Sequence, residues 1–183
     1  SVSLSSDGNT VAIGAHYNDA NTGTISNDHG HVRIYNYNGT SWIQIGNDID
    51  GEAIGDQSGY SVSLNDNGNI VAIGAPRNVG NGLDAGHVRI YENNGGVWIQ
   101  LGQDIDGTGG DQSGHSVSLS DDGNMVAIGA TSGTYAGTAR IYEWDSSSWS
   151  QLGQDLVCGG GMSGTSISLS GSKSAVIVGS PYS

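Results

Sequence analysis

The feature that most constrains the fold is a segment that occurs four times along the chain. Residues 1–15 read SVSLSSDGNTVAIGA, closely similar segments begin at Ser61 and Ser116, and a weaker copy begins at Ser166. These starting points are 60, 55 and 50 residues apart. Self-similarity at periods of about 20–50 residues is typical of propellers, solenoids and other arrays. The sequence therefore has to be interpreted one repeat at a time.

Each repeat predicts two β-hairpins. In the second copy, residues 61–64 (SVSL) alternate polar and apolar side chains, residues 66–69 (DNGN) favour a tight turn, and residues 70–75 (IVAIGA) suit a more buried strand. Residues 86–91 and 97–102 flank another Asn/Gly turn and form the second hairpin. A constant spacing of seven residues predicts three cross-strand aromatic pairs, Tyr35/Trp42, Tyr91/Trp98 and Tyr142/Trp149.

Four short antiparallel strands make one propeller blade. We therefore predict an all-β fold, a β-propeller-type array of four-stranded antiparallel blades with three complete blades and half of a fourth. The 32 Gly, two Pro and absence of Phe fit short strands with tight turns better than a helical bundle. The predicted blades are residues 1–57, 58–112, 113–162 and 163–183, together one repeat domain.

Charge and cysteine content exclude several classes of protein. The formal net charge is −13 and the chain has five basic residues in all, whereas nucleic acids and anionic membranes require clustered Lys and Arg. No apolar run approaches the ~20 residues of a spanning helix, so no membrane insertion is expected. A single cysteine, Cys158, excludes an internal disulfide and is interpreted as a half-buried small residue.

A family resemblance rests on three segments of the second repeat. Residues 58–62 (SGYSV), 71–76 (VAIGAP) and 86–91 (GHVRIY) resemble the FG-GAP repeat of integrin alpha-chain propellers and related extracellular proteins. Two features of that repeat are missing: Ser replaces its Phe, and the carboxylate-rich calcium loop between the first two strands is absent. The replacing residues are Ser58, Ser113 and Ser163.

The resemblance implies an extracellular or cell-surface propeller segment that acts as a structural or adhesive interaction module. It implies no enzymatic activity, and it is compatible with a subunit of a larger or filamentous assembly. Two alternatives stay open. One is a propeller accessory to a secreted hydrolase; the other is a lectin-like propeller that binds carbohydrate through Tyr17, Trp42 and Trp98.

Paired carboxylates are the main candidates for a site. Asp48 and Asp50, and likewise Asp104 and Asp106, are two residues apart, which places each pair on one face of a strand. Two carboxylates can begin the oxygen shell of a cation, so these four residues form a candidate metal site with calcium as the cation. Solvated turn residues are the alternative interpretation. No other cofactor and no catalytic nucleophile is predicted.

Other recurring residues are interpreted as scaffold. His31 and His87 occupy equivalent positions, which favours structural packing over catalysis. Arg recurs once in each complete repeat and is expected to pair with a recurring Asp, because a guanidinium forms forked hydrogen bonds with a carboxylate. The expected pairs are Arg33/Asp48, Arg89/Asp104 and Arg140/Asp155. Asn38 lies in an Asn-Gly-Thr sequon on an exposed turn and is the candidate glycosylation site.

All variation in repeat length lies between the second and third strands. This connection has 14 residues (16–29) in the first repeat, 10 (76–85) in the second and 6 (131–136) in the third. Loops that vary on a constant scaffold usually carry recognition. The half repeat leaves an open sheet edge. We therefore expect a protein partner, either further blades of a longer chain or head-to-tail copies of this one, with carbohydrate as the other candidate.

Overall fold

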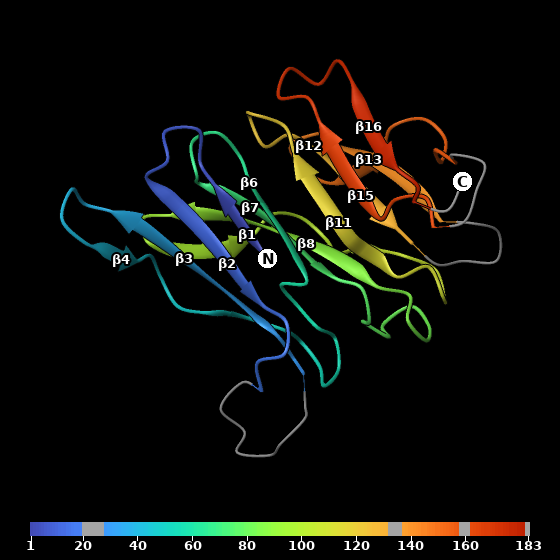
Figure 1. Cartoon of the computed structure of the whole chain (residues 1–183), viewed down its shortest axis with the longest axis horizontal. Coiled ribbons are helices and arrows are strands. Elements are labelled where there is room, and N and C mark those ends of the chain that lie inside the picture. The colour runs from blue at the N-terminus through green and yellow to red at the C-terminus, as the bar shows by residue number, and fades with distance from the viewer. Residues whose placement is uncertain (20–27, 132–136, 158–161, 182–183) are drawn as a thin grey trace.

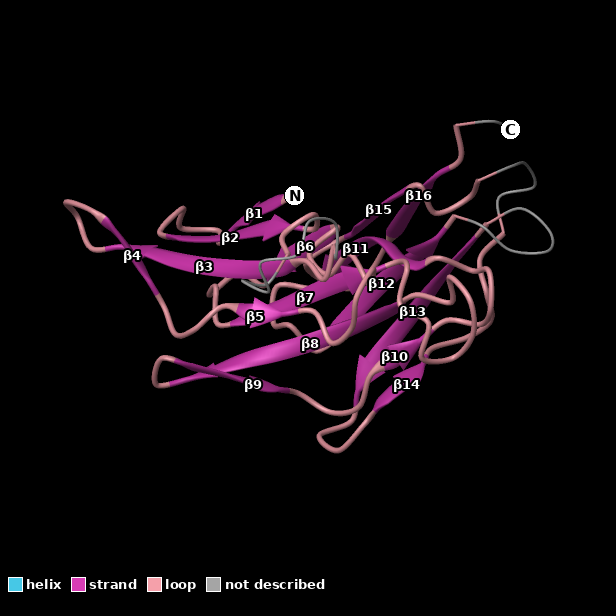
Figure 2. Cartoon of the chain, turned by 90° about the horizontal axis from the view of Figure 1, so that it is seen from below, coloured by secondary structure: helices cyan, strands magenta, loops and turns pink. Residues whose placement is uncertain are grey.

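The computed structural model describes residues 1–19, 28–131, 137–157 and 162–181, and their strands form sheets that lie side by side like a fan (Figures 1 and 2). Each complete sheet corresponds to one repeat. The fold is all-β, as the repeat predicts, and the described residues contain no helix. None of them forms a helix long and apolar enough to cross a bilayer. Cys158 falls outside the described residues.

The strands follow the repeat closely. The first sheet contains β1 (Val2–Leu4), β2 (Thr10–Ala15), β3 (His31–Tyr37), β4 (Trp42–Gln44) and β5 (Ile49–Asp50). The second contains β6 (Ser61–Leu64), β7 (Ile70–Ala75), β8 (His87–Asn94), β9 (Val97–Gln100) and β10 (Ile105–Asp106). The third contains β11 (Ser113–Leu119), β12 (Met125–Ala130), β13 (Thr138–Trp144) and β14 (Trp149–Gln151), and β15 (Ser166–Leu169) pairs with β16 (Val176–Gly179).

The short strands β5 and β10 are not in the four-strand prediction. β4 and β5 both pair with β3, and β9 and β10 both pair with β8. The outer strand of each blade is therefore one strand interrupted by a loop. Asp48 lies in this interruption and Asp104 in its counterpart, which is why both carboxylates are near the surface.

The hydrophobic core lies between blades rather than inside one sheet. The strands β1, β6, β11 and β15 are neighbours in space. The first cluster joins Val32 and Ile34 of one blade to Leu64 and Ile73 of the next. Two further clusters repeat this arrangement at the following junctions. Leu4 is 58% exposed, whereas its counterparts Leu64, Leu119 and Leu169 are each 7% exposed, because each of these three packs into a cluster with the preceding blade.

Hydrogen bonds between blades explain why the Ser-x-Ser-Leu motif recurs. The first Ser donates to a Gly carbonyl of the next blade, as from Ser61 to Gly114 at 2.8 Å. The second Ser accepts the N–H of the next blade's Leu, as Ser63 Oγ does from Leu119 at 3.0 Å. Both contacts recur at the other two junctions. Each blade thus satisfies buried polar groups of its neighbour.

The tryptophans also join blades. Trp98 Nε1 donates to the Ile45 carbonyl at 2.9 Å, and Trp149 Nε1 donates to the Leu101 carbonyl at 2.8 Å. This interblade position leaves Trp98 half-buried, whereas Trp42 and Tyr17 are 47% and 65% exposed.

The predicted aromatic partners are neighbours in one sheet, but they are two residues away from being directly opposite. The Tyr and Trp of each predicted pair share a sheet, but they are diagonal neighbours. The residues opposite Trp42, Trp98 and Trp149 are Tyr37, Asn93 and Trp144. The turn is tighter than the spacing alone suggests, so the partner lies two residues further along the strand.

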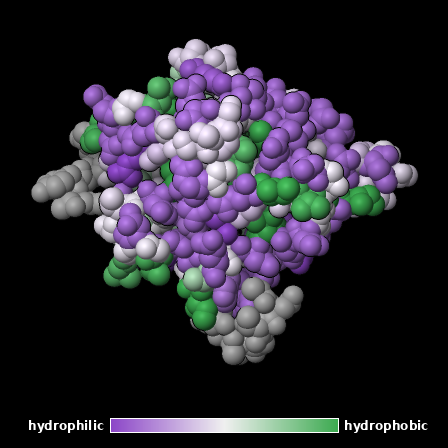
Figure 3. Space-filling view, turned by 180° about the vertical axis from the view of Figure 1, so that it is seen from behind, coloured by the Kyte–Doolittle hydropathy of each residue, from purple (hydrophilic) through white to green (hydrophobic). Residues whose placement is uncertain are grey.

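The face opposite the view of Figure 1 is mostly polar. Figure 3 shows a largely hydrophilic face on which apolar residues form small separate groups. Asn38 is exposed on the turn between β3 and β4, and its Oδ1 accepts hydrogen bonds from the backbone N–H groups of Thr40 and Ser41. Glycosylation at this position stays a prediction.

Candidate functional site

The chemistry-bearing side chains gather at one end of the blades. Antiparallel pairing sets Ala15 at the end of β2 opposite His31 at the start of β3, and His31 opposite Asp50 of β5. All connections from second to third strands, and from blade to blade, leave from this end. We call it the connector end; the opposite, hairpin end carries the tight turns.

A histidine and a carboxylate meet at the connector end of the first two blades. His31 Nδ1 lies 3.7 Å from Asp48 Oδ2, and His87 Nδ1 lies 3.6 Å from Asp104 Oδ2. Both imidazoles are buried, at 6% and 2% exposure. Burial is the main cause that lowers the pKa of each histidine, with the neighbouring arginine adding to it and the carboxylates opposing it. Both rings are therefore neutral near pH 7.

The arginines confirm two of the three expected pairs. Arg33 makes a forked contact with Asp48, with Nη2 2.8 Å from Oδ2, and Arg140 Nε donates to Asp155 Oδ2 at 3.0 Å. Hydrogen bonds from Arg33 are the main cause that lowers the pKa of Asp48.

The middle pair, Arg89 with Asp104, is wrong. Arg89 instead lies 3.3 Å from Glu52 and donates to the Asp50 carbonyl at 2.8 Å. Both acceptors belong to the connection from the first blade. Arg140 also reaches back to Asp111 of the preceding connection, at 2.9 Å. Arg89 and Arg140 therefore each bind the connection that precedes their own blade. Arg89 pairs with Glu52 because this connection carries an additional carboxylate there.

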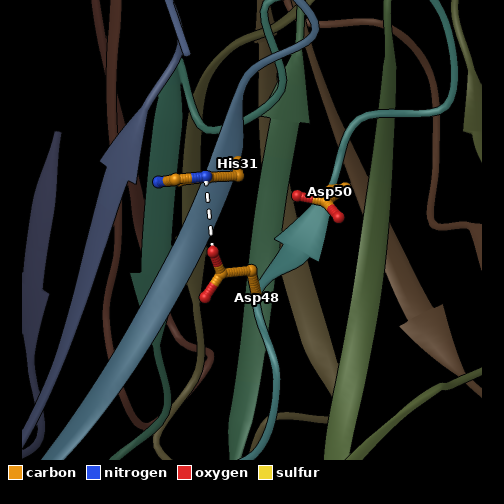
Figure 4. Close-up of side chains that lie close together, drawn as sticks. All are labelled: His31, Asp48 and Asp50. Carbon is orange, nitrogen blue, oxygen red and sulfur yellow. Dashed lines mark ion pairs between the residues drawn. The ribbon is translucent and has the colours of Figure 1, made fainter. Parts of the chain in front are cut away.

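The predicted cation residues separate into two groups. His31, Asp48 and Asp50 bring one ligand atom each within 4.8 Å of one another, and so do Glu52, His87 and Asp104. Figure 4 shows the first group, with His31 facing Asp48 and Asp50 beside them on β5. Asp106 is exposed and belongs to neither group.

These residues could hold a metal ion, although the donor set differs from the predicted one. A histidine nitrogen joins the carboxylates, whereas calcium prefers an all-oxygen shell. In addition, Asp48 already accepts hydrogen bonds from Arg33 and Gln44. A cation would have to compete with both partners.

A second cluster at the connector end is formed by residues from three repeats. The Tyr60 hydroxyl lies 3.1 Å from His115 Nε2, and their rings are 4.9 Å apart. The His16 ring lies 5.1 Å from Tyr60 at an edge-on angle of 61°, and Tyr17 stacks obliquely on His16. His16, Tyr60 and His115 are all half-buried, so they can meet both protein and solvent.

Burial lowers the pKa of both histidines in this cluster. For His16, burial is the main cause and Asp28 opposes the shift. For His115, burial is again the main cause. Its Nδ1 is buried without a hydrogen-bond partner. Neutral imidazoles beside a phenol hydroxyl can accept and donate protons near neutral pH.

The sequence interpretation missed this cluster because it looked for residues that recur. Tyr60 follows a Ser-Gly pair, and the equivalent positions in the next repeats are His115 and Thr165. His16 corresponds to Pro76 and Thr131. In an array, recurring residues serve the scaffold, so reactive residue types at positions that change from repeat to repeat are the signal that could have identified it.

No protein-family model and no curated protein matches the sequence. Solved structures do match. The periplasmic gluconolactonase of Pseudomonas aeruginosa is similar with a TM-score of 0.64 and 12% identity, over 98% of this chain and 50% of that one. The fold is that of a β-propeller. This likeness establishes the fold of the chain and leaves its activity open.

Two further neighbours are Bacteroides proteins described as candidate 6-phosphogluconolactonases. The B. uniformis protein matches with a TM-score of 0.58 and 11% identity, over 96% of this chain and 45% of that one. The B. fragilis protein matches with a TM-score of 0.56 and 14% identity, over 97% and 46%. The chain thus spans about half the length of these neighbours.

The comparisons correct three expectations. The resemblance to the FG-GAP repeat is wrong, since no family model supports it and these neighbours are lactonases rather than integrins. The expectation of an adhesive or filamentous module is overturned by the same finding. So is the expectation of a chain without enzymatic character, because lactonases are hydrolytic enzymes. Short apolar strands and Ser-Gly turns are demanded by blade packing, so they occur in unrelated propellers.

Proposed function

We propose that this chain forms part of a β-propeller hydrolase that opens a lactone, a cyclic ester of a sugar acid, outside the cytoplasm. The observation that carries the proposal is the half-buried contact between the Tyr60 hydroxyl and His115 Nε2, with His16 against Tyr60. The neighbours named as gluconolactonases supply the substrate class, and the periplasmic one supports the location. The accessory role to a hydrolase, one of the alternatives left open by the sequence, agrees best with these observations.

The three side chains have complementary roles in this proposal. His16, neutral near pH 7, takes a proton from a water molecule. The Tyr60 hydroxyl donates a hydrogen bond to the lactone carbonyl oxygen, where negative charge develops. His115 orients Tyr60 through Nε2 and is a positioning residue.

The reaction balances with water as the only co-reactant. The water oxygen bonds to the carbonyl carbon while its proton moves to His16. The ring C–O bond then breaks, and the proton passes from His16 to the departing ring oxygen. The product is an open hydroxy acid. General acid–base assistance of this kind contributes about 10²–10⁴-fold to a rate.

The test is hydrolysis of glucono-1,5-lactone by the protein, followed at constant pH by titration of the acid produced. We expect activity above the spontaneous rate, and a loss of about 10²-fold in Tyr60→Phe or His16→Gln. Tyr37→Phe is the matched control, because Tyr37 lies at the hairpin end and its hydroxyl donates to the Gly39 carbonyl. No activity above the spontaneous rate, or equal activity in Tyr60→Phe and Tyr37→Phe, would overturn the proposal.

We infer that calcium has no part in this function. Asp48 near His31 is bound by Arg33, and Glu52 near His87 is bound by Arg89. Their recurrence supports a role in holding the blades together. The lactone step above needs no cation.

A further inference from the structure

A surface hollow lies between the first and second blades, away from the His16–Tyr60–His115 cluster. Its volume is about 470 Å³, within the range of small-molecule sites. Asn47, Asp48 and Asp50 of the first blade line one side, and Tyr91, Val97 and Trp98 of the second line the other. β9 carries two of these residues at the outer edge of the molecule (Figure 2).

One residue in the repeat explains why this hollow is open. Each blade has a tryptophan on the strand after the second hairpin turn. The residue opposite this tryptophan is aromatic in the first and third blades, Tyr37 and Trp144, but it is Asn93 in the second. At the junction of the second and third blades, Trp144 packs over Gly102, so that a Cβ there would lie within 3.1 Å of Trp144 Cη2.

At the junction of the first and second blades no such ring is present. Around Gly46, the equivalent of Gly102, the nearest groups are the Gly96 carbonyl and Trp98. The indole of Trp98 stays in place, because its Nε1 is held by the Ile45 carbonyl. We attribute the hollow to the absence of this aromatic side chain, because Asn93 is not among the residues that line it. The remaining walls, such as Trp98, are held in place and are therefore preorganised.

The chemistry of the walls suits a neutral ligand with many hydroxyl groups. The carboxylates of Asp48 and Asp50 and the amide of Asn47 offer acceptors and a donor. The charge of Asp48 is balanced by Arg33, and the Asp50 backbone is bound by Arg89. Val97 and the edge of Trp98 supply an apolar surface opposite these polar groups.

We propose that this hollow binds a pyranose ring of a saccharide, with hydroxyls on Asp50 and Asn47 and the ring's C–H face on Trp98. The proposal does not depend on lactone hydrolysis. It gives the carboxylates of the first blade a second role beside blade packing. Of the three aromatic residues that the sequence offered for carbohydrate, it selects Trp98 and adds Asn47 and Asp50.

The test uses methyl pyranosides of glucose, galactose and mannose as probes, with binding followed by saturation-transfer NMR and calorimetry. We expect at least one of them to bind the wild type. Asn93→Trp restores the ring found in the third blade and should weaken binding more than about tenfold while leaving melting unchanged. Asp50→Ala removes an exposed acceptor and should weaken pyranoside binding by a similar factor. This variant keeps the proposal testable if Asn93→Trp fails to fold. Asp106→Ala, the equivalent carboxylate of the next junction, is the matched control.

The reverse substitution sharpens the test. Trp144→Asn should open an equivalent hollow beside Gly102 and add a second binding site. Three outcomes would overturn the proposal: no pyranoside binds, Asp50→Ala and Asp106→Ala bind equally well, or choline binds while the pyranosides do not, which would indicate a site for organic cations. Tyr60→Phe should leave pyranoside binding intact, so failure here and failure of the hydrolase proposal are distinguishable.

Discussion

Histidines occupy two kinds of environment in this molecule, and the two kinds differ in whether the residue recurs from repeat to repeat. His31 and His87 recur, are buried and face carboxylates, so they belong to the scaffold. His16 and His115 stand at positions that change between repeats and are half-buried next to Tyr60. The first kind affects stability through its protonation, whereas the second kind is available for proton transfer.

The buried pair predicts how stability depends on pH. The pKa of His87 is lower in the folded protein than its ordinary value of 6.5, mainly through burial. The unfolded chain therefore binds more protons, so the stabilisation is complete above about pH 6.5 and is lost as the pH falls toward the folded pKa. We expect the free energy of unfolding in urea to decrease between pH 7.5 and 5.5, and His87→Gln to flatten this decrease. An equal decrease in the wild type and the variant would contradict the assignment.

At the scale of elements, the first strand of each blade carries the serines that form hydrogen bonds with the next blade. Ser63 and Ser118 on β6 and β11 each accept the backbone N–H of a leucine in the following blade. The same strands pack their leucines into the clusters between blades. Hydrogen bonding and burial are therefore coupled at every junction.

This coupling can be tested with a matched pair of substitutions. Ser63→Ala leaves the Leu119 N–H without its acceptor in a half-buried place and should cost about 1–3 kcal/mol of unfolding free energy. Ser168→Ala is the control, because Ser168 is the equivalent residue on β15, is exposed, and accepts no leucine N–H from the described part of the chain. Denaturant unfolding measures both. A similar cost for the two variants would show that the interblade hydrogen bond is not the cause.

For the molecule as a whole, stability comes from stacking one blade on the next. The clusters lie at the three junctions, and Arg89 and Arg140 fasten each blade to the connection before it. Arg89 binds Glu52, and Arg140 binds both Asp111 and Asp155. We therefore expect the blades to stay together without a metal ion.

Chelation tests this view of the whole molecule. Because Asp48 already accepts hydrogen bonds from Arg33 and Gln44, removal of divalent cations should leave the melting transition almost unmoved. Melting is measured by circular dichroism with and without EDTA at constant ionic strength. A drop of several degrees that calcium reverses would contradict this view and indicate a structural ion, for which the two His/carboxylate groups are the candidates.

Local features of the sequence determined the blades. Alternating residues and Asn/Gly turns specify each hairpin independently of the rest of the chain, and the constant spacing of Arg and Asp predicted the contacts Arg33–Asp48 and Arg140–Asp155. These contacts lie within single repeats. Because both partners lie in the same repeat, their spacing along the sequence predicted them.

Tertiary structure decided what depends on the packing of one repeat against another. Arg89 binds Glu52 rather than Asp104 because the connection from the preceding blade passes beside it. Tyr60 and His115 are 55 residues apart and meet only because neighbouring blades place their first strands side by side. The hollow beside Trp98 likewise depends on what faces it across a junction. Such contacts follow from the angle between blades, which no single repeat encodes.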